Sequence, residues 1–257
     1  MIRFAAIAVV SVGLACCVAS AQNPPASDPQ AVSYAAQSIA AMAGGVSIGD
    51  VTLTGTATWN QSDTGTVILW ALGKNESRMD LTLTSGTRSE TRDAQTGVSL
   101  GRWTAPNQAS GNFAFQNCRT DSVWFYTALG SLAAGPNVVL TYIGQESRNG
   151  ATVQHIQSYL YQSGQVPSPT PQQLSTTDFY LDASTFLPVA VTFNAHPDKD
   201  ATANLLIEVD FSNYQTISGV VVPMHIQRYQ QGNLMVDIEV SEASFNSGLS
   251  LSTFSIN

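Results

Sequence analysis

The chain has 257 residues, which is long enough for one large all-β domain with a sizeable core. Only 11% of its residues are charged, against about 25% in ordinary globular domains, and uncharged polar residues take their place. This composition is typical of an exported, β-rich protein. The net charge of −8 argues against a nucleic-acid-binding surface and against charge-driven docking on anionic lipid.

The first residues have the pattern of a signal peptide. Arg3 precedes an apolar run at residues 4–19, and Ala19-Ser20-Ala21 forms a small-residue cleavage site. A transmembrane anchor is the weaker interpretation, because the run is barely long enough to span a bilayer and no basic stop-transfer cluster follows it. We expect residues 1–21 to be removed near Ala21 and residues 22–28 to form a tether. The mature protein is then periplasmic or secreted.

The cysteines leave one alternative open. Gly13-Leu14-Ala15-Cys16 faintly resembles a bacterial lipobox, in which the cysteine carries lipid, but Gly13 stands where a bulky aliphatic residue belongs. Ordinary cleavage is therefore favoured over lipidation at Cys16. The folded domain keeps one cysteine, Cys118, for which we expect a buried position rather than a reactive thiol.

Residues 29–43 are predicted to form an amphipathic helix. Asp28 is a good N-cap, Pro29 suits the first helical position, and Gly44-Gly45 ends the pattern. The stripe expected to face a sheet consists of Val32, Ala36, Ile39 and Ala43, widened by Ala35 and Met42.

After this helix the hydrophobic period changes from 3.6 to 2, which predicts strands. The first covers 51–59, and a turn is predicted at Ser62-Asp63-Thr64-Gly65. Strands at 67–71 and 79–83 follow, and then polar strands between 86 and 103. Thr120-Asp121 as a cap and Gly135-Pro136 as a stop predict a second helix over 121–133, with an apolar stripe of Phe125, Leu129 and Leu132.

From residue 138 onwards the pattern is strand after strand. A hairpin over 138–161 turns at Asn149-Gly150, a proline-rich loop covers 164–173, and a second hairpin over 179–193 turns at 182–185. Strands at 203–213, 220–229 and 233–245 complete the chain. We predict a single domain, 29–257, that is mainly β with some helix (α+β). Its large curved antiparallel sheet forms an incomplete barrel covered by two α-helices, because a sheet of this size does not stay flat.

Two of the last strands have a clean apolar face. This face is predicted to bind ligand and consists of Leu205, Ile207, Val209 and Phe211 with Leu234, Val236, Ile238 and Val240. Acidic residues such as Glu208 and Asp210 alternate with them and are expected to point outwards. Two helices cannot cover so large a face. The interior is therefore filled either by the protein's own side chains or by an apolar guest.

Several stretches resemble lipoprotein-carrier proteins of the LolA type and their relatives. TDFYLDASTFLP at 177–188 is similar to their strand, Asp-x-x-Thr-x-Leu-Pro, strand hairpin. VDFSNY at 209–214, followed by SGVVVP at 218–223, is similar to their strand, Tyr, Gly-x-x-x-Pro, strand connection. Phe245-Asn246 and Phe254 resemble their usual ending, so the similarity covers about 138–257.

The resemblance implies an incomplete barrel around helices that act as a lid, with an apolar cavity for acyl chains and a periplasmic location. The helices over 29–43 and 121–133 would then be the parts that move aside when cargo enters. Phe125, Leu129 and Leu132 would be the residues of the lid helix that face the cavity.

The sequence carries no motif for catalysis or metal binding. Its three histidines, His155, His196 and His225, form no pair with metal-ligand spacing. Neither a serine-nucleophile motif nor a glycine-rich phosphate loop is present. We therefore predict a protein that is not an enzyme and that uses no cofactor and no metal.

The predicted function is that of an exported, non-enzymatic carrier or binder of lipid acyl chains or lipoprotein anchors, acting as a monomer. The alternative is a structural or interaction module of the cell envelope, with a side-chain-filled barrel, envelope-protein partners and no cargo. Nucleic acid is not an expected partner.

Overall fold

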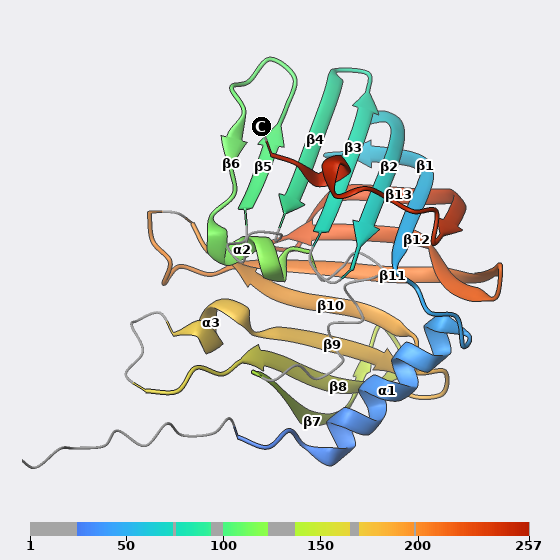
Figure 1. Ribbon diagram of the computed structural model, residues 1–257, viewed down its shortest axis with the longest axis vertical. Helices are drawn as coiled ribbons and strands as arrows, with labels where there is room; N and C mark the ends of the chain where they lie inside the picture. The colour runs from blue at the N-terminus through green and yellow to red at the C-terminus, as the bar shows by residue number, and fades with distance from the viewer. Residues whose placement is uncertain are drawn as a thin grey trace, which may run out of the picture.

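The computed structural model of the protein describes residues 25–73, 76–93, 100–122, 137–164, 170–197 and 199–256. Within these ranges, thirteen strands form one antiparallel sheet (Figure 1). Residues 1–24, which contain the predicted signal peptide and the start of the tether, lie outside the described residues. So do residues 123–136, which contain Phe125, Leu129 and Leu132.

The strands divide into two groups along the chain. The first group comprises β1 (Asp50–Trp59), β2 (Asp63–Leu72), β3 (Glu76–Leu83), β4 (Gly86–Asp93), β5 (Leu100–Thr104) and β6 (Gly111–Asn112). The second comprises β7 (Val138–Arg148), β8 (Ala151–Leu160), β9 (Thr177–Asp182), β10 (Pro188–Ala195), β11 (Leu205–Ile217), β12 (Val220–Gln230) and β13 (Asn233–Phe245).

Short helices accompany one long helix. They are α1 (Pro29–Ala43), α2 (Phe115–Thr120), α3 (Pro171–Ser175) and the 3₁₀ helix η2 (Leu251–Phe254). In the part of the chain that the structure describes, no helix has both the length and the hydrophobicity needed to cross a bilayer.

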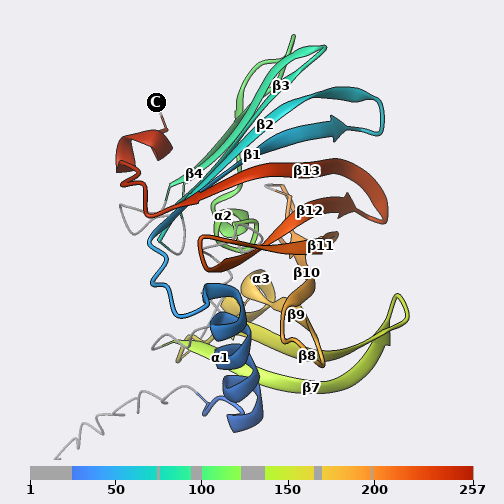
Figure 2. The same cartoon turned by 90° about the vertical axis from the view of Figure 1, so that its right-hand side faces the viewer.

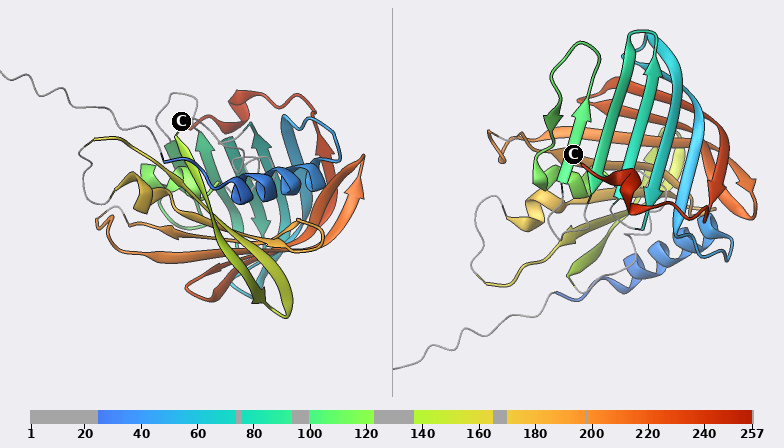
Figure 3. Two further views of the ribbon diagram at one scale, coloured as in Figure 1. Left: turned by 90° about the horizontal axis from the view of Figure 1, so that it is seen from below. Right: turned by 45° about the horizontal axis from the view of Figure 1, so that its top comes forward.

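The strand order is β6-β5-β4-β3-β2-β1-β13-β12-β11-β10-β9-β8-β7, so each group is a meander and β1 joins the two by pairing with β13. Figure 2 shows the sheet curling until α2 lies between the β1–β4 part and the β10–β12 part. Seen from below, the sheet forms a trough with α1 across its open side (Figure 3, left). The predicted incomplete barrel is confirmed, with the concave surface as its inner face.

Polar contacts close the seam between β1 and β13. Asp50, at the start of β1, accepts hydrogen bonds from the backbone N–H groups of Ser247 (2.8 Å), Gly248 (2.9 Å) and Leu249 (3.2 Å). Burial alone would raise the pKa of Asp50, but these bonds favour the carboxylate, and the pKa lies below its ordinary value. The bonds fix the chain that leaves the last strand against the beginning of the first.

At two glycines the backbone of a neighbouring strand approaches closely. A Cβ on Gly55 would lie 2.0 Å from the carbonyl oxygen of Glu239, and one on Gly65 would lie 1.9 Å from that of Thr82. A register shift in the β1–β13 pairing occurs directly before Gly55. Glycine and a bulge permit the close backbone approach that a strongly curved sheet requires.

Most of the predicted hairpins are confirmed, and one turn is corrected. Asn149 and Gly150 have φ angles of 50° and 82° and connect β7 to β8 as expected. The first turn, however, lies at residues 60–62, where Asn60 and Gln61 have positive φ, and not at 62–65. Gly65 lies within β2 and is not part of the turn. The absence of a side chain at this position lets β2 approach β3 closely.

Helix α1 has the predicted ends. The Asp28 carboxylate accepts hydrogen bonds from the N–H groups of Gln30 (2.7 Å) and Ala31 (3.4 Å), Pro29 occupies the first turn, and Gly44 ends the helix with φ 56°. These are standard signals for the start and stop of a helix.

The buried face of α1 differs from the predicted one by a rotation of about one residue. Its buried residues are Ala31, Ala35, Ser38 and Met42. Val32 is 39% exposed and Ala36 is also exposed, so the stripe predicted through these two residues was wrong, although Ala35 and Met42 were correctly included. Most side chains of this helix are small, so hydrophobicity does not define one face, and the smallest residues allow the closest approach to the sheet.

Both α1 and the chain before it are attached to the edge strand β7. The N–H of Asp28 donates to the carbonyl oxygen of Leu140 (2.8 Å), and the N–H of Leu140 donates to Ser27 Oγ (3.0 Å). The ring of Tyr34 contacts Tyr142 and Phe186, with centroid distances of 5.4 and 5.5 Å. These contacts cover part of an unpaired strand edge and join α1 to the β9–β10 turn.

The outer, convex face of the sheet carries the acidic residues that the alternation predicted. Arg148 on β7 contacts Glu208, and its Nη2 lies 4.0 Å from Asp210. Burial raises the pKa of Asp210 to about 6, and the negative charge of Glu208 and a hydrogen bond with it act in the same direction, opposed by Arg148. Folding therefore favours the protonated form of this carboxyl group.

This raised pKa predicts a stabilising substitution. Stability associated with protonated Asp210 is complete below the ordinary aspartate pKa and is lost as the pH rises through about 6. We expect Asp210→Asn to raise the free energy of unfolding by about 1 kcal/mol above pH 7, after allowance for solvent screening, and to have little effect near pH 4. Thermal unfolding at both pH values measures this, with the exposed Glu242→Gln as the control. A gain of equal size at both pH values would contradict the assignment.

Candidate functional site

The predicted ligand-binding face lies on the inside of the curved sheet. Six of its residues are between 0% and 8% exposed: Ile207, Val209, Phe211, Val236, Ile238 and Val240. Leu205 and Leu234, near strand ends, are half-buried. The structure therefore brings the eight residues to one face. Their role in ligand binding stays a prediction.

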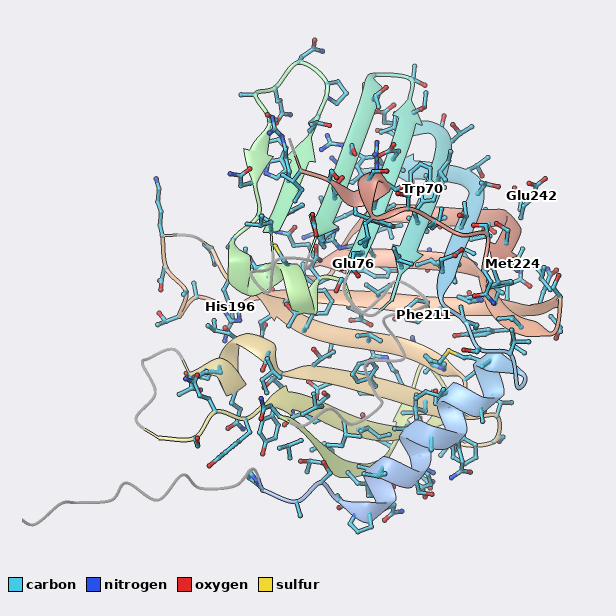
Figure 4. All side chains as sticks on the ribbon, viewed as in Figure 1. Trp70, Glu76, His196, Phe211, Met224 and Glu242 are labelled. Carbon is cyan, nitrogen blue, oxygen red and sulfur yellow. The ribbon has the colours of Figure 1, made fainter. Side chains whose placement is uncertain are left out.

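The inner face continues well beyond these two strands. Val220, Val222, Met224 and Ile226 of β12 are buried between β11 and β13. In Figure 4, Phe211 and Met224 lie towards the C-terminal end of α1, whereas His196 lies beside α2 at the far end of β10. The side chain of Asn117 on α2 donates to the carbonyl oxygen of His196 (2.8 Å) and accepts from its N–H (2.7 Å). These two bonds fix α2 to the sheet.

A cluster of charged residues is buried at one end of the inner face; we call it the charge cluster. It consists of Glu90 and Arg92 on β4, Asp121 directly after α2, and Arg228 on β12. Arg92 Nη2 donates to Glu90 Oε2 (3.1 Å) and also contacts Asp121, while Arg228 Nη2 donates to Asp121 Oδ1 (2.8 Å). Arg228 Nη1 lies 3.7 Å from Glu90 Oε2. Each carboxylate therefore interacts with both arginines.

The electrostatics of the charge cluster follow from its burial. The Arg92 side chain is 1% exposed and its guanidinium group lies over the Phe113 ring, 4.5 Å from the centroid. Burial lowers the pKa of Arg92, and the Glu90 carboxylate opposes this change. For Glu90, burial would raise the pKa, but the positive charges of Arg228 and Arg92 outweigh it and hold the pKa below its ordinary value.

The segment around α2 differs from the prediction in one respect. Asp121 was expected to cap the start of a helix over 121–133, but it lies at the C-terminal cap of α2 and its carboxylate binds the two arginines. Residues 123–133 of the predicted lid helix lie outside the described residues. Cys118 is buried as predicted, against Gly101, where a Cβ would lie 2.7 Å from its Sγ.

The charge cluster was not predicted from the sequence. Residues 86–103 have no hydrophobic alternation, so nothing local shows which face of β4 carries Glu90 and Arg92. One signal was available: the inner positions of β12 run Val220, Val222, Met224, Ile226 and then Arg228. A charged residue that ends an apolar series marks a polar end of the inner face.

Within the described residues, His225, Asp237 and Glu239 have side-chain atoms close enough to share a cation. They lie on the outer face of β12 and β13, where His225 Nε2 is 2.7 Å from Asp237 Oδ1 and 3.5 Å from Glu239 Oε1. The imidazole and Asp237 already hydrogen-bond directly, and the Glu239 side chain is 63% exposed. The arrangement is that of a polar surface contact.

The sequence matches no protein-family model and no curated protein. Solved structures are similar in fold. A putative outer membrane lipoprotein-sorting protein domain from Vibrio parahaemolyticus aligns over 87% of this chain and 95% of its own, with TM-score 0.53 and 15% identity. A DUF1329 family protein from Desulfovibrio piger aligns over 87% of this chain and 96% of its own, with TM-score 0.51 and 10% identity.

A LolA superfamily protein from Nitrosomonas europaea aligns over 88% of this chain and 97% of its own, with TM-score 0.50 and 10% identity. Two of the segments that resemble LolA-type carriers contact each other in the structure. The hydroxyl group of Tyr214 on β11 donates a hydrogen bond to the carbonyl oxygen of Pro188 (2.5 Å). The chain has the fold of LolA-superfamily and lipoprotein-sorting structures.

The charge cluster makes a testable contribution to stability. We expect Arg92→Met to lower the free energy of unfolding by about 3–5 kcal/mol at pH 7, because it leaves two buried carboxylates with the guanidinium group of Arg228 alone. Urea unfolding followed by circular dichroism measures this loss. The control is Arg78→Met, which breaks the partly exposed pair of Arg78 and Asp80 on β3 and is expected to cost about 0–1 kcal/mol. Equal losses in the two variants would contradict the role of the charge cluster.

Proposed function

We propose that the protein is an exported, non-enzymatic binder or carrier of lipid acyl chains, taken either as free lipid or as the acyl anchor of a lipoprotein. The observation that carries the proposal is the continuous apolar inner face of β11, β12 and β13 in an open, curved sheet. Acyl chains bind by burial of apolar area. Each Å² of apolar surface removed from water contributes about 25 cal/mol, so such a face can bind an acyl chain without specific polar contacts.

The nature of the cover supports this proposal. Helix α1 packs on the inner face through Ala31, Ala35, Ser38 and Met42, with Tyr34 and Ile39 partly buried beside them. Three of the four fully buried side chains are small and bury little apolar area. Ser38 Oγ is buried without a hydrogen-bond partner in the described residues. Detaching such a helix from the sheet costs less free energy than detaching a hydrogen-bonded strand. In this proposal α1 is therefore the part that moves aside when an acyl chain enters.

The structural neighbours fit the same proposal. One of them is described as a putative outer membrane lipoprotein-sorting protein domain, and a role of that kind for this chain would place it outside the cytoplasm. The apolar run at residues 4–19 and the Ala19-Ser20-Ala21 site are the matching export signal, with the mature protein in the periplasm.

One observation favours the second candidate, an envelope interaction module without cargo. Ile207, Val209 and Phe211 are at most 3% exposed, so the protein's own atoms cover this face in the closed form. Native mass spectrometry separates the two. The full chain is expressed with its own leader in a bacterial host, and the processed protein is purified without detergent. A bound mass that solvent extraction removes as lipid supports the binder. A protein that stays free of ligand after incubation with phospholipid supports the interaction module.

Adjacent residues on opposite faces of β11 provide the mutational test. We expect Ile207→Asp to lower lipid loading by more than about a hundredfold, because a carboxylate on an apolar face is costly to bury. Glu208→Ala, on the outer face, is expected to load normally. Circular dichroism checks folding, and Val240→Asp, at a less buried position of the same face, replaces Ile207→Asp if that variant does not fold. Normal loading of both inner-face variants would exclude this face as the binding surface.

A further inference from the structure

Several buried polar atoms around the charge cluster have no hydrogen-bond partner in the part of the chain that the structure describes. They are Arg92 Nε, Arg92 Nη1, Arg228 Nε, Arg88 Nε and Ser77 Oγ. A buried donor without an acceptor is costly, and native proteins leave few such donors. Their concentration in one place indicates that an acceptor group belongs there.

These donors share one face of the sheet. Arg88, Glu90 and Arg92 occupy alternate positions of β4 and therefore point to the same side. Ser77 on β3 lies directly opposite Arg92 in the β3–β4 pairing. Arg228 reaches the same place from β12 through its contacts with Asp121 and Glu90.

The charges at this place do not balance. Three guanidinium groups, of Arg88, Arg92 and Arg228, face the two carboxylates of Glu90 and Asp121. Arg88 has no ion pair within the described residues; its guanidinium lies over the Trp59 ring, 4.0 Å from the centroid. Among the residues that the structure describes, one positive charge is therefore uncompensated, and the missing acceptor is expected to be negatively charged.

The unpaired donors lie directly beside the apolar inner face. In the strand register Arg228 is opposite Val209 on one side and Val236 on the other, so all three point the same way. The inner positions of β12 are apolar from Val220 to Ile226 and end in Arg228. A long apolar surface that ends in unpaired guanidinium donors matches a molecule with an apolar tail and an anionic head.

We propose that the cargo is an acyl chain with an anionic head group, a carboxylate or phosphate, that is bound by Arg88, Arg92 and Arg228 while the chain lies on the inner face. This inference rests on the proposed function and adds the chemistry of the head group. Guanidinium groups form short, paired hydrogen bonds with the oxygens of a carboxylate or phosphate. A neutral hydroxyl head offers one weaker acceptor and no compensating charge.

The test compares ligands that share a tail. Oleate, oleyl alcohol and inorganic phosphate are titrated separately into the lipid-free mature protein by isothermal titration calorimetry, below the concentration at which the lipids aggregate. We expect oleate to bind about tenfold to a hundredfold more tightly than oleyl alcohol, because charge-assisted hydrogen bonds are added to the same apolar contact. Free phosphate is expected to bind far more weakly than oleate.

Variants assign the preference to these arginines. Arg228→Met is expected to bring oleate binding down to the level of oleyl alcohol and to change oleyl alcohol binding far less than oleate binding. Arg88→Gln, which breaks no ion pair in the described residues, is expected to lower the preference for oleate in part, and it provides the test if Arg228→Met does not fold. The control Arg78→Gln lies on the opposite face of β3 and is expected to keep the full preference.

The outcomes separate the two levels of the proposal. Equal affinity for oleate and oleyl alcohol overturns the anionic head group and leaves the acyl-chain binder standing. Unchanged preference in both Arg228→Met and Arg88→Gln overturns the role of these arginines. Phosphate binding as tight as that of oleate also overturns the proposal, since it indicates an anion site independent of any chain. If neither lipid binds, the proposed function fails as well.

Discussion

The backbone pairing of β1 with β13 is the contact on which the rest of the structure depends. It joins two meanders that are continuous along the chain into one sheet, with β6 and β7 as its two terminal strands. The Asp50 carboxylate strengthens this seam by binding the chain that leaves β13. Because the first and last strands meet in the middle of the sheet, the inner face exists only after nearly the whole domain has folded. Such long-range pairing makes folding slow.

Curvature and burial are coupled in this architecture. A flat sheet of this size would expose one apolar face to water, whereas curling encloses that face within its own strands and a few helices. The bend requires close backbone approach at Gly55 and Gly65, and the open side requires a cover. Helix α1 serves as that cover without being part of the hydrogen-bonded sheet. The same geometry that stabilises the domain therefore provides a separable surface over an apolar face.

The polar end of the inner face introduces a second kind of chemistry. Buried ion pairs contribute little net stability unless all their donors and acceptors are satisfied, and several donors of the charge cluster have no partner among the described residues. Arg92 and Glu90 are held by each other, by Asp121 and by Arg228, so their positions are well determined by the protein. A preorganised group of guanidinium donors at the end of an apolar surface is suited to recognition more than to stability.

Local patterns predicted the parts of this structure that depend on neighbouring residues. The Asn149-Gly150 turn, the cap at Asp28 and the alternation of β11 and β13 were read correctly, because backbone geometry and period-two burial are local properties. The predicted buried face of α1 was rotated by about one residue from the observed one, because a helix of mostly small side chains has no single strongly hydrophobic face. Gly65 was misread as a turn because its role, a close approach to Thr82, involves another strand.

The sequence by itself determined the class of fold, the inner and outer faces of the last strands, and the resemblance to LolA-type carriers, since all of these are written in runs of adjacent residues. The tertiary structure alone decided that β1 pairs with β13, and that Glu90, Arg92, Asp121 and Arg228 meet. The charge cluster draws on β4, α2 and β12, which are far apart in the chain. A charged residue on a polar strand looks the same in sequence whether it faces water or the interior, and only the curvature of the completed sheet distinguishes the two.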